Sequence, residues 1–133
     1  MTTQTNLKEL ISKLKKSFKS KITKEQVLDP EWLEINIKNK IDSTGFCFYA
    51  SEVIYRLTGG KNVWLIKKIA KEVFPEGPHY FLQNKETKEI LDITADQFTK
   101  LGINIPYEKG KGRGLQNISK SARKLANTIG HEL

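Results

Sequence analysis

The chain has 133 residues, of which 38% are hydrophobic, 9% aromatic and 29% charged, and this composition is typical of one ordinary globular domain spanning residues 1–133. The formal net charge of +8 is confined to the ends, since residues 1–24 carry +6, residues 25–108 carry −3 and residues 109–133 carry +5. The absence of a long apolar run and of a secretion signal excludes a membrane span, and one cysteine excludes an internal disulfide, so we expect a cytoplasmic protein.

The first predicted element is an amphipathic helix. Apolar residues recur at three- and four-residue steps from Leu7 to Phe18, with lysines between them. The apolar face is expected on the core and the lysine face in solvent; the alternative is a basic helix that binds nucleic acid, a membrane or an acidic partner. Further on, Asp29-Pro30-Glu31 predicts the start of a short helix, because it combines a cap, a proline and an acidic first turn.

The single cysteine, Cys47, follows a turn at 43–45 and shares helical spacing with apolar residues as far as Leu57. Gly59-Gly60 then ends the pattern. This predicts a helix with Cys47 in its first turn. The next stretch, residues 63–74, fits either a strand or a second helix.

Two β-prone runs, 79–83 and 89–93, are separated by a polar loop of hairpin length and are predicted to be antiparallel neighbours. Pairing around this loop brings together residues whose numbers sum to about 172, which places His79 beside Asp92. An offset of one residue, common where a hairpin contains a bulge, would bring the two side chains onto the same face.

The last third of the chain predicts two helices and a loop. Thr94 and Gln97 have the spacing of a capping box, so a helix is expected to begin just after Asp92. The stretch 107–116 contains three glycines and no period, which predicts a loop, and Ser119 is expected to cap a final helix. The fold class is therefore α+β, with the Cys47 helix packed on a small antiparallel sheet.

These residues suggest nucleophilic chemistry. A helix N-terminus stabilises a thiolate, and its free N–H groups can hold an oxyanion, so Cys47 is a candidate nucleophile. His79 is the candidate base, because His131 lies close to the chain end, and Asp92 is the candidate group that orients the imidazole. The alternative is structural: a small buried cysteine, a half-buried strand histidine and a turn-forming acid.

A cysteine opening a helix, a histidine opening a strand and an acid on the next strand follow the chain order of papain-like and transglutaminase-like cysteine enzymes. Over residues 29–125 the chain more closely resembles the small bacterial and phage YunG-like proteins, through Gly45-Phe46-Cys47 and the segments 78–82, 90–98 and 119–123. The resemblance implies a papain-like (NlpC/transglutaminase-like) core with a Cys47-His79-Asp92 arrangement, and it implies no cofactor and no metal.

The chain departs from that pattern at Phe46, where members often have glutamine or a small polar residue. Papain-like enzymes also complete the oxyanion hole with an upstream glutamine, and residues 27–46 contain none. The candidates that could replace it are Asn36, Asn39, Ser43 and Thr44.

The expected function is a thiol-dependent hydrolase or acyltransferase acting on an amide or thioester of a protein or small molecule. The residues expected at the substrate cleft are Phe46, Lys111 and Arg113. Trp64 and Tyr107 are candidates for the same cleft, with a place in the core as the stronger alternative. The glycine-rich loop is expected to be a surface loop; it could instead bind phosphate or RNA, or border the cleft and select acidic substrates. The alternative function is a catalytically inactive module whose basic ends bind nucleic acid, at most weakly and non-specifically, or an acidic protein.

Overall fold

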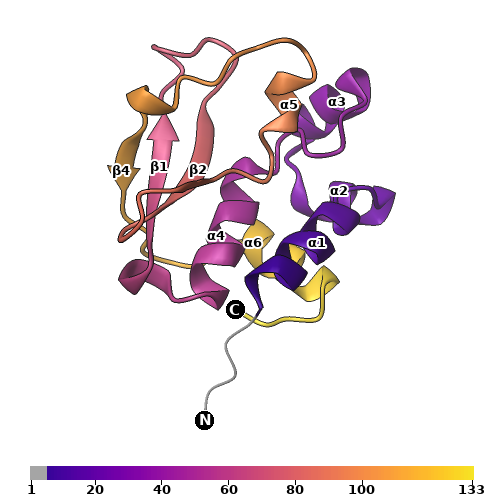
Figure 1. Ribbon diagram of the computed structural model, residues 1–133. Helices are drawn as coiled ribbons and strands as arrows, with labels where there is room; N and C mark the ends of the chain where they lie inside the picture. The colour runs from indigo at the N-terminus through magenta and orange to yellow at the C-terminus, as the bar shows by residue number, and fades with distance from the viewer. Residues whose placement is uncertain (1–5) are drawn as a thin grey trace.

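The computed structural model describes residues 6–133, which form an α+β fold with six α-helices and a four-stranded antiparallel sheet (Figure 1). The sheet has the order β3-β2-β1-β4, and α4 lies between it and the helices α1 and α6. The elements in chain order are α1 (Leu7–Ser17), α2 (Lys21–Val27), α3 (Pro30–Asn39), α4 (Cys47–Leu57), the 3-10 helix η1 (Gly60–Asn62), β1 (Trp64–Ile69), β2 (His79–Asn84), β3 (Ile90–Leu91), α5 (Asp96–Thr99), the 3-10 helix η2 (Tyr107–Lys109), β4 (Lys111–Arg113) and α6 (Lys120–Thr128).

Local signals account for most helix starts. The Asn6 side chain accepts hydrogen bonds from the first-turn N–H groups of α1, and the Ser119 hydroxyl accepts from Ala122 at the start of α6. The predicted helices from Leu7, Asp29, Cys47 and Ser119 are confirmed. The short helix α2 was not predicted, and Asp29 occupies the cap of α3 without making a side-chain cap bond.

The predicted capping box at Thr94 and Gln97 is wrong. Helix α5 begins only at Asp96, and its cap residue Ala95 provides no side-chain bond. Both side chains of the motif are engaged elsewhere: the Thr94 hydroxyl donates to Asp92, and the Gln97 side-chain oxygen accepts from the N–H of Gly45. A local hydrogen bond to Asp92 and a tertiary one from Gly45 therefore use the two polar groups on which the cap motif depends.

The sheet resolves one open alternative and corrects one prediction. Residues 64–69, open between strand and helix, form β1, which pairs with both β2 and β4. Residues 111–113 were expected in a loop but form β4, with Arg113 opposite Ile66. Glycine and lysine have low strand propensity, so this edge strand depends on backbone pairing to β1, which the sequence pattern does not reveal.

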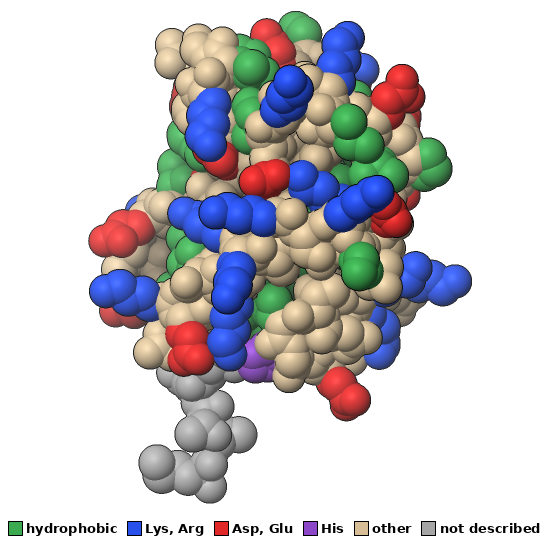
Figure 2. Space-filling view, turned by 90° about the vertical axis from the view of Figure 1, so that its right-hand side faces the viewer, with side chains coloured by type: hydrophobic (Ala, Val, Ile, Leu, Met, Phe, Trp, Pro, Cys, Tyr) green, Lys and Arg blue, Asp and Glu red, His purple; other side chains and the backbone are tan. Residues whose placement is uncertain are grey.

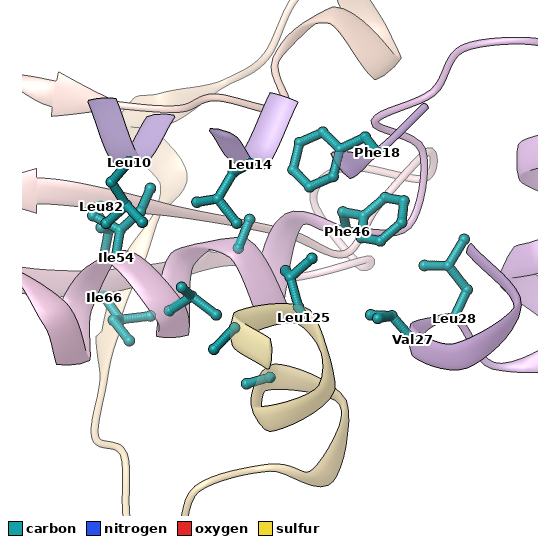
Figure 3. Close-up of a cluster of buried hydrophobic side chains, with 14 of the residues drawn as sticks. Leu10, Leu14, Phe18, Val27, Leu28, Phe46, Ile54, Ile66, Leu82 and Leu125 are labelled. Carbon is teal, nitrogen blue, oxygen red and sulfur yellow. The ribbon is translucent and has the colours of Figure 1, made fainter. Parts of the chain in front are cut away.

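The main core lies between α4, the sheet and the surrounding helices, as Figure 3 shows. Phe18 stacks on Phe46 with ring centroids 4.5 Å apart, and Leu125 of α6 approaches α4 in the same cluster. A second, smaller cluster forms around Phe81 and Phe98 at the other side of the sheet. Together the two clusters fix α4 and β2, which carry Cys47 and His79.

The surface shows where the basic residues gather. On the face carrying the helices at the right of Figure 1, Lys and Arg side chains form a band across the middle, with Asp and Glu side chains among and around them (Figure 2). Within residues 6–133, no helix combines the length and apolar character needed to cross a membrane.

Candidate active site

Cys47 is the first residue of α4, and its side chain is about 9% exposed. The first backbone bond of this helix runs from the N–H of Ala50 to the carbonyl of Phe46, at 2.8 Å. The N–H groups of residues 47–49 therefore precede the intrahelical pattern, and Phe46, the cap residue, offers them no side-chain acceptor. The thiol thus lies at the positive end of an 11-residue helix.

His79 opens β2 and is held by Asp92. The imidazole Nε2 lies 2.6 Å from Asp92 Oδ2, and the two side chains are 0% and 4% exposed. The strand register explains the contact, because β2 and β3 pair Leu82 with Leu91 and Gln83 with Ile90, so paired residue numbers sum to 173. Continued beyond β3, this register brings Asp92 onto the face of the sheet that His79 shares.

Asp92 is anchored by more than the imidazole. Its Oδ2 also accepts a hydrogen bond of 2.8 Å from the Tyr107 hydroxyl, and its Oδ1 accepts from the N–H and the hydroxyl of Thr94, each at 3.3 Å. Four donors therefore surround one nearly buried carboxylate. Such a set fixes the orientation of the carboxylate.

The other imidazole nitrogen, Nδ1, is not engaged by Asp92. Within residues 6–133, Nδ1 of His79 is buried and has no hydrogen-bond partner of ordinary geometry. Burial lowers the pKa of His79, but the hydrogen bond to Asp92 and the nearby Cys47 thiol, together with the charges of both groups, outweigh this and raise the pKa to about 9. Because Asp92 occupies Nε2, Nδ1 is the nitrogen left for the thiol.

The thiol borders a pocket of about 270 Å³. Its walls are largely aromatic, and it is lined by Asp29, Trp32, Gly45, Cys47, Phe48, Tyr49, Pro78, Tyr80 and Arg113. Arg113 stacks over two of these rings, with its guanidinium carbon 4.8 Å from the ring centre of Phe48 and 5.6 Å from that of Tyr80. The lining therefore combines an aromatic wall with one cation, Arg113, and one anion, Asp29.

Of the five residues considered for the cleft, Arg113 alone lines the Cys47 pocket. Phe46 is fully buried against Phe18, and Trp64 is 6% exposed in the main core, where its indole N–H donates to Thr58 at 2.8 Å. Both are core residues because the apolar surface they bury stabilises α4 and β1. Lys111 is exposed on β4, outside the residues that line the pocket.

Tyr107 follows the core alternative, since it packs against the smaller hydrophobic cluster and does not line the cleft. It packs edge-to-face on Phe81 and donates to Asp92, behind the imidazole and outside the thiol pocket. The side chains that sequence reasoning missed are Thr94, as a donor to Asp92, and the aromatic pocket residues Trp32, Phe48, Tyr49 and Tyr80. The sequence offered one signal for these pocket residues, since Phe48 and Tyr49 directly follow the candidate nucleophile in the chain.

The residues expected to replace the oxyanion glutamine lie elsewhere. The Asn36 amide donates to the carbonyl groups of Asp42 and Thr44, and the Ser43 hydroxyl donates to Asp96. Asn39 and Thr44 border a neighbouring pocket. The donors at the thiol are thus the backbone N–H groups of the α4 N-terminus.

No cluster of metal-ligating side chains occurs in the part of the chain that the structure describes. Comparison of the chain with protein-family models, with curated proteins and with solved structures gave no match. The geometry of Cys47, His79 and Asp92 is therefore what indicates a function.

Proposed function

We propose that the chain is a thiol-dependent acyl-transfer enzyme with a papain-like core, a hydrolase or acyltransferase whose substrate is an amide or thioester. Cys47 is the nucleophile, His79 the proton carrier and Asp92 the residue that orients the imidazole. The observation that carries the proposal is the 2.6 Å contact between His79 Nε2 and Asp92 Oδ2, which leaves Nδ1 for the thiol at the N-terminus of α4.

The resting state supports this chemistry. A pKa of about 9 keeps His79 protonated at neutral pH, and the imidazolium favours a thiolate at Cys47. The first-turn N–H groups of α4 favour the same anion. We therefore expect a protonated imidazole beside the thiol before substrate arrives.

Acylation follows from this pair. The thiolate attacks the carbonyl carbon, forms a C–S bond and places the negative charge on the carbonyl oxygen, which the N–H groups at the start of α4 stabilise. The tetrahedral intermediate collapses as the bond to the leaving nitrogen or sulfur breaks. His79 Nδ1 gives its proton to that leaving group, so the products are an acyl-thioester at Cys47, a neutral imidazole and a free amine or thiol.

Deacylation reverses the proton flow. The neutral imidazole takes a proton from water, or from an acceptor amine, as that molecule attacks the thioester carbonyl. The C–S bond breaks and Cys47 leaves as thiolate beside the imidazolium, so that the resting state is restored. Water yields a carboxylic acid, whereas an amine yields a new amide.

The proposal is tested by the thiol's reactivity in the folded protein. Iodoacetamide should label Cys47 at pH 6–7, where an ordinary thiol with pKa near 8.5 is protonated, and faster than it labels the urea-unfolded chain at the same pH. Intact-protein mass spectrometry measures the rate. Cys47→Ser should abolish labelling, His79→Gln should slow it about tenfold or more, and Asp92→Asn should slow it partially.

His131→Gln is the matched control, because His131 lies at the far end of the chain, and it should leave the rate unchanged. A thiol that reacts only after unfolding would overturn the proposal. Cys47 would then be a core residue, and binding through the basic ends would be the function to pursue, with a steep loss of nucleic-acid affinity as salt rises.

A further inference from the structure

Three cations lie beside the Cys47 pocket, on the side of the sheet that faces α4. β1 and β4 pair Lys68 with Lys111, and Arg113 lies two residues further along β4. Directly paired residues point to the same face of a sheet, as do residues two apart on one strand, so the three side chains share a face. Arg113 stacks over the ring of Phe48 on α4, which identifies that face as the one toward α4.

These cations have no carboxylate partner in the part of the chain that the structure describes, since none of them takes part in an ion pair. Lys68 and Arg113 instead lie over the ring of Tyr80, at 5.9 and 5.6 Å from its centre. Like charges directly opposite each other on paired strands are unfavourable, so Lys68 and Lys111 repel. The carboxylate of the pocket lining, Asp29, is the cap residue of α3 and lies outside the sheet. An anion over β4 would therefore meet unpaired positive charge.

The strand that carries two of these cations has a free backbone edge. β4 lies at the end of the sheet order β3-β2-β1-β4, at the left in Figure 1, and its three residues are exposed. Among the described residues, its backbone groups pair with β1 alone. A Cβ added at Gly112 or Gly114 would meet no atom within 4 Å, so no other element covers the strand there. The outward N–H and C=O groups of β4 are therefore available to a second chain.

We infer that β4 binds an extended acidic peptide, which pairs with the free edge as an added strand and carries an acidic residue at every second position. Strand side chains have a period of two, so the spacing that places Lys111 and Arg113 on one face places alternate peptide residues beside them. Backbone pairing then gives affinity, and the carboxylates give selectivity.

The position of β4 connects this edge with the thiol. Because Arg113 also lines the Cys47 pocket, a peptide along β4 reaches the rim of that pocket. As a substrate subsite the edge rests on the proposed function, and it then selects amides that lie in acidic segments. Lys111 lies outside the pocket lining, so it should contribute to the binding of a peptide although not to that of a small reagent at the thiol.

Other occupants satisfy this edge less well. A second copy of the chain would pair β4 with itself and so place lysine and arginine against lysine and arginine. A nucleic acid strand would supply negative charge, but it does not present N–H and C=O groups at the spacing of a β-strand. An acidic peptide supplies both the charge and the backbone partners.

The test is fluorescence anisotropy of labelled peptides with the full-length Cys47→Ala protein. The probe is a short peptide in which glutamate alternates with threonine. It should bind saturably and about tenfold more tightly than the same peptide with glutamine in place of glutamate, because two exposed charge pairs are lost. A peptide with its glutamates grouped at one end, and an alternating peptide with methylated backbone nitrogens, should each bind severalfold more weakly, since the first loses the spacing and the second the backbone pairing.

Variants of the protein locate the site. Lys111→Gln and Arg113→Gln should each weaken binding of the alternating peptide about threefold, as expected for one exposed charge pair. Lys67→Gln is the matched control: Lys67 precedes Lys68 on β1 and pairs with Gly112, so it removes the same charge from the opposite face of the sheet and should leave the affinity unchanged.

Equal losses at positions 67 and 111, or equal binding of the grouped and alternating peptides, would overturn the inference, because a general positive field would then explain both. Tighter binding of a single-stranded oligonucleotide than of the alternating peptide would also overturn it. Because the protein tested lacks the thiol, peptide binding is independent of the chemistry. A reactive Cys47 without saturable peptide binding would overturn this inference alone, and an unreactive Cys47 with selective peptide binding would overturn the proposed function alone.

Discussion

Tyr107 and His79 share one oxygen of Asp92: the Tyr107 hydroxyl lies 2.8 Å from Oδ2, and His79 Nε2 lies 2.6 Å from the same atom. Burial and the Asp92 charge raise the pKa of Tyr107 above its ordinary value near 10, so the phenol keeps its proton and donates. The Tyr107 hydroxyl and the His79 imidazole therefore compete for the same carboxylate oxygen. Tyr107 acts on the site through Asp92, as a positioning residue.

Tyr107→Phe should raise the pKa of His79 further. Removing the phenol leaves Oδ2 to the imidazolium alone, and a hydrogen bond of ~1 kcal/mol corresponds to roughly half to one pKa unit. The measurement is an NMR titration of the His79 ring protons. Tyr55→Phe, on α4 and away from Asp92, is the control and should leave the titration unchanged. A lowered pKa in Tyr107→Phe would show that the phenol does not compete for the carboxylate.

The stability of the fold should depend on pH through His79. Its folded pKa of about 9 exceeds the value of about 6.5 expected in the unfolded chain, so the folded state holds a proton that the unfolded state releases between these values. The stabilisation is complete below pH 6.5 and is lost as pH rises through 9. Urea unfolding at pH 6, 7.5, 9 and 10 should show the wild-type advantage over His79→Gln shrinking steadily.

His131→Gln should follow the wild type at every one of these pH values, since His131 takes no part in the buried pair. A constant difference between wild type and His79→Gln from pH 6 to pH 10 would contradict the raised pKa.

Substitutions at Phe46 and Phe48 should affect the stability of the fold and the labelling of Cys47 differently. Phe46 is fully buried, so Phe46→Leu should lower the free energy of unfolding by about 1 kcal/mol or more while leaving Cys47 labelling in the folded protein almost unchanged. Phe48 lines the pocket under Arg113, so Phe48→Leu should change labelling more than stability. Urea unfolding and iodoacetamide kinetics, measured on both variants, check the pair. The reverse pattern would place Phe46 at the cleft.

Arg113 should favour negatively charged reagents at the thiol. The rate ratio of iodoacetate to iodoacetamide labelling of Cys47 should fall severalfold in Arg113→Gln, because the guanidinium is the cation of the pocket lining. Lys111→Gln removes the same charge two residues away on the exposed strand and should change the ratio much less. Asp29→Asn should raise the ratio, since Asp29 is the anion in the same lining. Equal effects at 111 and 113 would indicate only a general field of the basic C-terminal region.

The sequence predicted best those features that depend on local pattern. The helix starting at Cys47 followed from a turn, helical spacing and two glycines, and the hairpin of β2 and β3 followed from two β-prone runs and a polar loop. The contact between His79 and Asp92 required a register offset of one residue. The loop length allowed that offset but did not determine it.

The sequence pattern did not predict features that depend on residues far away in the chain. The β4 strand exists because β1 offers an unpaired edge, and its own residues carry no strand signal. Thr94 and Gln97 matched a cap motif, yet the Thr94 hydroxyl donates to Asp92, two residues before it, and the Gln97 side chain accepts from Gly45 across the fold. Phe46 was expected at the cleft but is buried in the core, and Phe48, to which no place was assigned, lines the pocket.

The complete enclosure of His79 has a consequence for how the proposed reaction ends. Nε2 is occupied by Asp92, and the ring is fully shielded from bulk water, so Nδ1 is the only route by which the imidazole exchanges a proton. In the proposed reaction that route passes the thiol, and an acyl group on Cys47 closes it. The second reactant must then enter together with, or behind, the departing group. Whether the product is an acid or a new amide is thus decided by which nucleophile first occupies the vacated end of the pocket.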